Sequence, residues 1–176
     1  MKNRIRIYTT ILTAALGVGM TFAAYAVSSR EAEALSKSTV SLAKATEIAE
    51  KKGQGKTISA EFDIEKNRPV WEVKVLGDAG VMEYKIDAST GAVVKVEDEH
   101  IRGKLTNFVT GMNLLDLNST KTSLVQAVTA AENKLKGKAV MVEVEHEHDR
   151  IQYDIFVRAA DKTEKVKIEA DTGQPQ

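Results

Sequence analysis

The chain contains a gapless internal repeat. When the sequence is shifted by 82 positions, residues 41–91 align with residues 123–173 without an insertion, and 17 of the 51 aligned positions are identical. Repeats of this kind are supersecondary units, each of which buries its apolar face against a neighbour. The sequence therefore predicts one small structure that occurs twice, and any local assignment has to fit both copies.

Each copy begins with the pattern of an amphipathic helix. Ser41 and Ser123 can accept hydrogen bonds from the free amides of a first helical turn. Leucine and alanine then recur at helical spacing, which places them on one face. Gly53, Gly55 and Gly137 mark the ends of these patterns, since glycine adopts the left-handed conformation without strain.

After each helix, the apolar period changes from 3.6 to two residues, which predicts half-buried antiparallel strands. Three strands are expected in each copy, and residues 92–96 add a fourth that the second copy lacks. The predicted fold class is α+β, with two tandem repeats that each pack one helix on a small antiparallel sheet of three to four strands. Units of this size are marginal alone, so either the two repeats support each other or the chain forms a homodimer.

The segments outside the repeats differ in character. Residues 1–26 combine a basic start, an uncharged apolar stretch and Ala24-Tyr25-Ala26, which predicts a signal peptide cleaved after Ala26 and a periplasmic or secreted protein. The alternative is a retained membrane anchor, for which the apolar stretch is short. Residues 27–40 are polar and predict a tether or a short frayed helix.

Residues 97–120 connect repeat 1, residues 41–96, to repeat 2, residues 121–176. Seven large apolar side chains between Leu105 and Leu117, Phe108 among them, exceed what a solvated connection needs. We expect the linker to pack against the repeats, and Phe108 is one candidate for partner binding.

The composition excludes several classes of site. The chain has no cysteine, so disulfide frameworks and thiolate zinc sites are ruled out. After signal cleavage it would carry 22 basic and 25 acidic residues, without the basic and aromatic clusters that bind nucleic acid. Neither a nucleophile elbow nor a metallopeptidase motif is present. We therefore expect no enzyme activity, no cofactor, no nucleic-acid partner and no membrane association after cleavage.

The three histidines offer a metal site as an alternative function. His146 and His148 lie two residues apart in a predicted strand, so both would point to the same face and could chelate Zn²⁺ or Cu²⁺ if further ligands converge. The first copy has Ile64 and Lys66 at these positions, so the pair is no part of the shared fold. His146 is more simply a partly buried position near a hairpin end.

Three aromatic side chains are the remaining candidates. Trp71 and Tyr153 occupy the same position of the repeat, on the apolar face of a strand, where packing under the helix explains them. Phe156 interrupts the alternation because Lys74 has its place in the first copy. We expect Phe156 to face outward and to contact the linker or a protein partner.

A soft motif set is shared by both copies. A serine-capped helix with leucine and alanine precedes a strand, an aromatic residue lies early in the next strand, and the last strand ends at Asp87, Thr90 and Gly91, which predict a turn. The repeat unit resembles the PepSY domain in these features, over residues 41–96 and 123–173.

The resemblance implies a non-catalytic domain that binds or restrains a peptidase. PepSY domains occur in propeptides of secreted metallopeptidases, in regulators of cell-wall hydrolases and in exported stand-alone proteins. No peptidase follows the second repeat, so the resemblance implies an exported binding or regulatory module that acts on a separate partner, such as an exported peptidase. The alternative is a periplasmic protein that binds a small ligand or a metal through His146 and His148.

Overall fold

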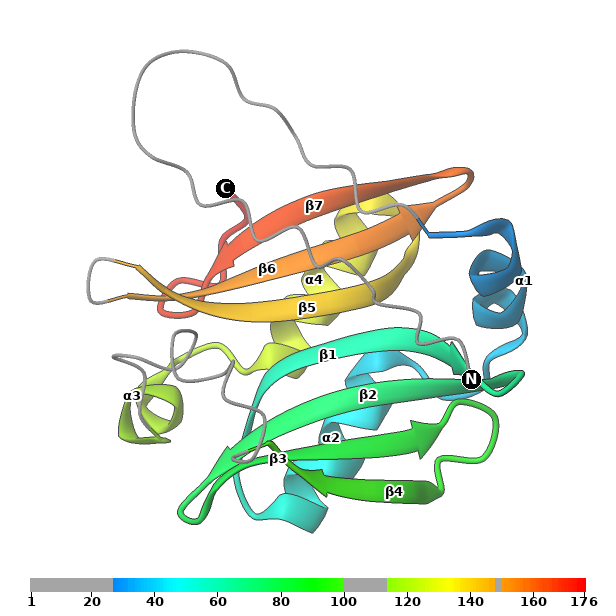
Figure 1. Ribbon diagram of the computed structural model, residues 1–176. Helices are drawn as coiled ribbons and strands as arrows, with labels where there is room; N and C mark the ends of the chain where they lie inside the picture. The colour runs from blue at the N-terminus through cyan, green and yellow to red at the C-terminus, as the bar shows by residue number, and fades with distance from the viewer. Residues whose placement is uncertain (1–26, 100–113, 148–149) are drawn as a thin grey trace, which may run out of the picture.

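The computed structural model describes residues 27–99, 114–147 and 150–176 (Figure 1). The predicted signal peptide lies outside these ranges, as do Phe108 and His148. None of the described helices is long and apolar enough to cross a membrane.

Two units, each with one helix and consecutive antiparallel strands, make up most of the fold. The first unit consists of α2 (Leu42–Gly53), β1 (Lys56–Glu65), β2 (Arg68–Gly77), β3 (Gly80–Asp87) and β4 (Val93–Asp98). The second unit consists of α4 (Leu124–Leu135), β5 (Lys138–Glu147), β6 (Arg150–Ala159) and β7 (Lys162–Glu169). The helix and the three long strands of the second unit each begin 82 residues after their counterparts, at 124, 138, 150 and 162 against 42, 56, 68 and 80. Two shorter helices are α1 (Ser29–Lys37) and α3 (Leu114–Ser119).

The strands form one seven-stranded antiparallel sheet in the order β4-β3-β2-β1-β5-β6-β7 (Figure 1). The prediction of helices packed on antiparallel sheet is confirmed. The prediction of two small sheets is not, because β1 and β5 pair with each other. Each unit alone would leave the outer edge of its first strand open, and pairing these edges satisfies the backbone groups of both.

The β1–β5 pairing, which we call the seam, is symmetric. Ala60 lies opposite Val142, which is the residue 82 positions further along the chain. Ser59 pairs with Glu143, and Glu61 with Met141, so the two strands exchange equivalent positions on either side of that central pair. A two-fold axis therefore relates the units, as in an isologous dimer interface.

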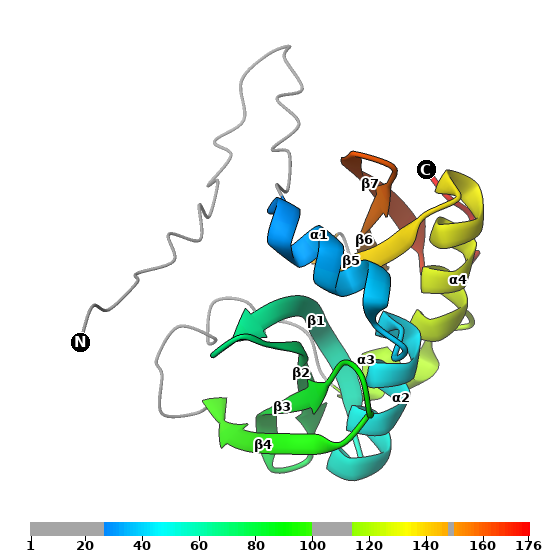
Figure 2. The ribbon, with the colours of Figure 1, turned by 90° about the vertical axis from the view of Figure 1, so that its right-hand side faces the viewer.

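Helices α2 and α4 lie side by side on one face of the sheet (Figures 1 and 2). One hydrophobic core runs beneath both helices and across the seam. Its largest fully buried side chains are Trp71, Leu42, Ile58, Ile86, Ile155, Ile168, Val73, Val75, Val128, Val140, Val142 and Val144. The opposite face of the sheet carries the alternate, polar positions of the strands.

The ends of the helices are built alike. The side chains of Ser41 and Ser123 accept from the third amide of α2 and α4, which confirms both predicted caps. The left-handed residue at each helix end, however, is Gln54 or Lys136 and not a glycine. Glycine is needed one residue later, because a Cβ on Gly55 would come within 2.2 Å of the Leu76 carbonyl oxygen. Gly137 meets the Arg158 carbonyl in the same way, at 2.3 Å.

A bulge near the start of β1 and of β5 is held by the helix above it. The amide of Thr57 donates to Glu50 at 2.9 Å, and the amide of Ala139 donates to Glu132 at 2.8 Å. Both strands change register just after these residues. The two glutamates are identical positions of the repeat, and each holds an amide that the ladder leaves unpaired.

The turn after β3 follows the predicted chemistry. The Asp87 carboxylate accepts from the amides of Ser89 and Thr90 at 3.0 and 2.8 Å, and Gly91 has φ of +75°. Partial burial alone would raise the pKa of Asp87, but the hydrogen bonds from Thr90 and Ser89 outweigh it and lower the pKa below its usual value. The turn is therefore a structural element.

The repeat extends further than the sequence comparison indicated. Helix α1 lies in the polar segment 27–40, where its cap Ser28 and Glu31 form a capping box. Leu35 of α1 and Leu117 of α3 are 82 residues apart and both are buried in the core. Helix α1 also reaches the second unit, because Lys138 on β5 donates to the Leu35 carbonyl oxygen at 3.3 Å.

Candidate functional site

A buried ammonium group lies on the polar face of the first unit. The side chain of Lys85 on β3 is only 7% exposed, and it donates to Glu72 on β2 at 2.8 Å and to Glu65 on β1. Carboxylate oxygens of Glu83 and Glu97 lie 3.5 and 4.0 Å from the same nitrogen. We call Lys85 and these four glutamates the Lys85 cluster.

Electrostatics act in opposite directions on Lys85 and on Glu83 of the Lys85 cluster. Burial alone would lower the pKa of Lys85, but the hydrogen bonds to Glu65 and Glu72 outweigh burial and raise it. Burial, followed by the charge of Glu72, raises the pKa of Glu83, against which Lys85 and Lys74 act. Lys74 lies 3.9 Å from Glu83 and 3.8 Å from Glu99, so the buried carboxylates have cations beside them.

The second unit has a different arrangement on the same face. Asp154 on β6 is buried and lies 2.8 Å from Lys165 and 3.8 Å from Lys167, both on β7. Gln152 also donates to Asp154, at 2.8 Å. Burial and, after it, the charge of Asp154 raise the pKa of Glu143, which Lys165 partly offsets. Two lysines at the outermost strand thus share one hydrogen-bonded carboxylate.

The charged groups of these two clusters bind one another. Their charges are paired with one another across neighbouring strands, and a carboxylate held by lysine is a poor general base at neutral pH. Among the described residues, no group of three or more histidine, cysteine, aspartate or glutamate side chains is placed to hold a metal ion.

The histidine alternative depends on residues that lie partly outside the described ranges. His146 lies near the end of β5, opposite Ile151 on β6, and is half-buried. His148 is outside the described residues, so the structure does not show whether the two imidazoles share a face. The metal site stays a prediction.

The aromatic candidates divide in the same way. Phe156 on β6 lies opposite Met141 on β5 and Lys165 on β7. Its ring is half-buried, and the Lys165 ammonium lies 5.8 Å from the ring centroid, within the range of a cation–π contact. Phe156 therefore belongs to the charged face of the second unit, while Phe108 lies outside the described residues.

Trp71 and Tyr153 anchor the chain that enters each helix. The Trp71 indole donates to the Val40 carbonyl at 2.8 Å, and the Tyr153 hydroxyl donates to the Thr122 carbonyl at 2.9 Å. Val40 and Thr122 are themselves 82 residues apart. Both aromatic side chains are buried, which supports their interpretation as core residues.

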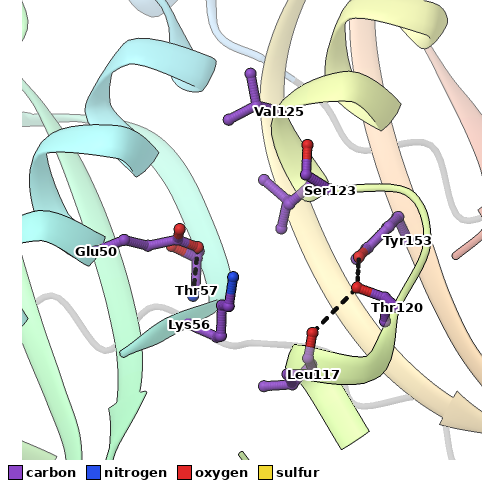
Figure 3. A pocket seen from close by; sticks show the side chains of 9 residues that line it. Glu50, Lys56, Thr57, Leu117, Thr120, Ser123, Val125 and Tyr153 are labelled. Carbon is purple, nitrogen blue, oxygen red and sulfur yellow. Dashed lines mark hydrogen bonds between the residues drawn. The ribbon is translucent and has the colours of Figure 1, made fainter. Parts of the chain in front are cut away.

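Tyr153 is one of the residues that line a small cavity beside the seam (Figure 3). It measures about 40 Å³ and lies between the end of α2, the start of β1 and the α3–α4 segment. Glu50 and Thr57 face Tyr153 and Thr120 across it, and burial raises the pKa of Tyr153. One water needs a cavity volume of about 10–15 Å³. The cavity therefore has room for waters and not for a larger ligand.

Sequence reasoning missed the Lys85 cluster. The alternation of Glu72 with Lys74 and of Glu83 with Lys85 is typical of a solvated face, yet Glu83 and Lys85 are each 6% exposed. The signal was present in the matching of opposite charges between neighbouring strands. Reading it requires the strand register, which places Glu72 opposite Lys85 and Lys74 opposite Glu83.

A known family matches the first unit. Residues 39–97 match the PepSY family, whose model is described as peptidase propeptide and YPEB domain. The matched range covers α2 and β1–β4, which is the helix–sheet unit of the first repeat. No curated protein matches the chain.

A search of solved structures finds one match to this chain. A crystal structure described as that of a "putative lipoprotein" from Clostridium difficile 630 covers 79% of this chain and 91% of its own. The two chains share 21% sequence identity and superpose with a TM-score of 0.49.

Proposed function

We propose that this chain is an exported tandem PepSY-like protein that binds, and thereby restrains, a separate protein partner. The first partner we would test is a peptidase of the cell envelope. Residues 41–96 and 121–176 are the two repeats of this proposal, residues 1–26 are its signal peptide and residues 97–120 its linker. The PepSY match over residues 39–97 is the observation that carries the proposal.

The second repeat is proposed from the architecture. Its helix, three long strands, serine cap, bulge and buried aromatic anchor each lie 82 residues after those of the matched unit. A shared offset for so many independent features supports duplication of one domain. The two-fold seam then supports a rigid pair that presents one continuous sheet to a partner.

Restraint of a partner by binding agrees with the chemistry of the polar face. The buried Lys85 is paired with carboxylates within the protein, whereas Lys165 and Lys167 are partly exposed and can discriminate between partners through complementary charge. Propeptide-like inhibition requires a surface that fits the partner, and it requires no reacting group. The polar face of the two units is proposed as such a surface.

Affinity capture tests the proposal. The chain without residues 1–26 is immobilised and exposed to the exported protein fraction of its own source, and each recovered peptidase is assayed with and without added chain. We expect at least one peptidase to be recovered and to be slowed in proportion to the chain added. The proposal fails if no peptidase is recovered, or if those recovered cleave substrate at an unchanged rate.

A further inference from the structure

The two outer edges of the sheet are finished differently. In the first unit, β4 pairs with β3 along its length. In the second unit, the described residues that lie in the place of β4 are those of the short segment 174–176, in which Pro175 bridges Ile168. That bridge repeats the pairing of Ile86 with Val93 at the 82-residue offset. The first contact of a fourth strand is thus present, and none of the described strands continues it along Lys162–Val166.

The backbone groups that this edge presents can be deduced. The amide of Gln176 donates to the Lys167 carbonyl at 2.9 Å, so the backbone polar groups of Lys167 point away from β6. In an antiparallel ladder, alternate residues point the same way. The amides and carbonyls of Thr163 and Lys165 therefore point outward too. The Thr163 hydroxyl, on the same stretch, is buried without a hydrogen-bond partner among the described residues.

The charges beside β7 indicate which kind of strand could pair with its outer edge. In the first unit, β4 brings the Glu97 carboxylate to within 4.0 Å of Lys85. In the second unit, the equivalent lysine is Lys167, and Lys165 replaces Glu83. Both lysines are about one-third exposed and share Asp154. Because Gln176 already pairs with Lys167, a strand added along Lys162–Val166 would lie opposite Lys165 and end beside Lys167. An acidic side chain opposite Lys165 would be matched in charge.

We propose that the outer edge of β7, Lys162–Val166, binds an extended acidic segment of the partner protein as an added antiparallel strand. An acidic side chain of this segment lies opposite Lys165, on the side of the charged face that also carries Lys167, and an apolar one lies opposite the buried Val166. The inference rests on the proposed function, because it names the surface through which that function acts. A second copy of this chain fits poorly, since two β7 edges would bring their lysines together.

A short peptide based on the β4 sequence provides the probe. The acidic peptide is Val-Val-Glu-Val-Glu-Asp, which is the β4 sequence with glutamate in place of Lys95, and the matched basic peptide is Val-Val-Lys-Val-Lys-Lys. Each is titrated into the full-length ¹⁵N-labelled chain. We expect saturable amide shifts confined to Lys162–Val166 with the acidic peptide, and affinity at least tenfold lower for the basic peptide.

Three variants separate backbone pairing from charge. Thr163→Pro removes an outward amide at an edge, where proline is tolerated, and should weaken acidic-peptide binding at least tenfold. Lys165→Ala keeps the amide and should weaken binding less, with a smaller salt dependence. Lys95→Ala removes a half-exposed lysine at the opposite edge and should bind as wild type does. Circular dichroism and Trp71 fluorescence verify folding.

Several results would overturn the assignment. These are the absence of saturable binding, shifts that centre outside β7, or a folded Thr163→Pro variant that binds like wild type. Protection of Thr163 and Lys165 amides that grows with protein concentration in the absence of peptide would assign the edge to a second copy. If the Thr163→Pro variant captures a peptidase as well as the wild type does, this surface is refuted and the proposed function is not. If the acidic peptide binds but no peptidase is slowed, the proposed function is refuted and this surface is not.

Discussion

The two units of the sheet share their inner face and differ on their outer face. Under the helices, the aromatic anchor, the glutamate that holds the bulge and the close-packed glycine recur at equivalent positions. On the polar face, Lys85 is buried among four glutamates, whereas Lys165 and Lys167 share Asp154 and remain partly exposed. The first unit also has β4 along its edge. The comparison teaches that folding fixes the inner positions, while the outer positions of the second unit are where a specific interaction can arise.

Substitutions of the two buried aromatic residues, Trp71 and Tyr153, test how much each contributes to the stability of the shared inner face. Trp71 is fully buried and packs edge-on against Phe62, with ring centroids 5.1 Å apart. Trp71→Ala should therefore lower the free energy of unfolding by about 3–5 kcal/mol, as measured by urea denaturation. Tyr153→Phe removes the hydroxyl that donates to the Thr122 carbonyl at 2.9 Å and lies 3.4 Å from the Thr120 hydroxyl, and should lower the free energy of unfolding by about 1 kcal/mol. A loss below that of Tyr153→Phe in the Trp71 variant would contradict the packing described.

The polar face gives the second prediction, because equivalent lysines have unequal burial. Lys85→Met leaves buried carboxylates without their cation and should lower the free energy of unfolding by about 3 kcal/mol. Lys167→Met removes a side chain that is 37% exposed, and the loss should stay below about 1 kcal/mol. Equal losses in urea unfolding would show that the two faces are energetically alike and would remove the contrast between the units.

The close-packed glycines sharpen the equivalence of the two units. A methyl group at Gly55 or Gly137 meets a carbonyl oxygen of the neighbouring strand, which must shift. Gly55→Ala and Gly137→Ala should each lower the free energy of unfolding by about 1–3 kcal/mol, and by similar amounts. If either alanine variant is as stable as the wild type in thermal unfolding, the neighbouring strand can shift without strain, which would contradict the prediction.

The smallest expected effect concerns pH. The pKa of Glu143 is raised in the folded protein, so between its unfolded value near 4.5 and the folded value the native state holds more protons. Stability contributed by the neutral carboxyl is then lost as pH rises through this window. Glu143→Gln should remove this loss. In urea unfolding, the free energy of unfolding of the variant should therefore rise relative to that of the wild type between pH 4 and pH 8. Glu164→Gln, at an exposed position on β7, is the control; parallel curves for Glu143→Gln and wild type would contradict the prediction.

The sequence predicted the parts of the fold that depend on local patterns. Ser41 and Ser123 cap their helices, and the alternating segments form the strands, because capping and period-two burial are written in neighbouring residues. The seam was not predictable in this way. Strands β1 and β5 pair around Ala60 and Val142, whose side chains would be as apolar in two separate sheets.

Long-range placement explains the other differences. Leu35 and Leu117 lie in segments that share few residues at the 82-residue offset, so their equivalence became visible only when both were found in the core. The burial of Lys85 depends on residues from β1, β2, β3 and β4. Of the predicted site residues, Phe156 lies beside Lys165 at the proposed binding edge, whereas the pairing of His146 with His148 stays a prediction.

Hydrogen exchange at the two outer strands tests the central comparison most directly. The amides of Glu83 and Lys85 point toward β4; Lys165 is the 82-residue equivalent of Glu83, and Thr163 lies two residues before it on the outer edge of β7. We predict slow exchange at Glu83 and Lys85 and fast exchange at Thr163 and Lys165. Equal protection of the two outer pairs in the isolated, monomeric chain would contradict the account, because both edges would then be covered.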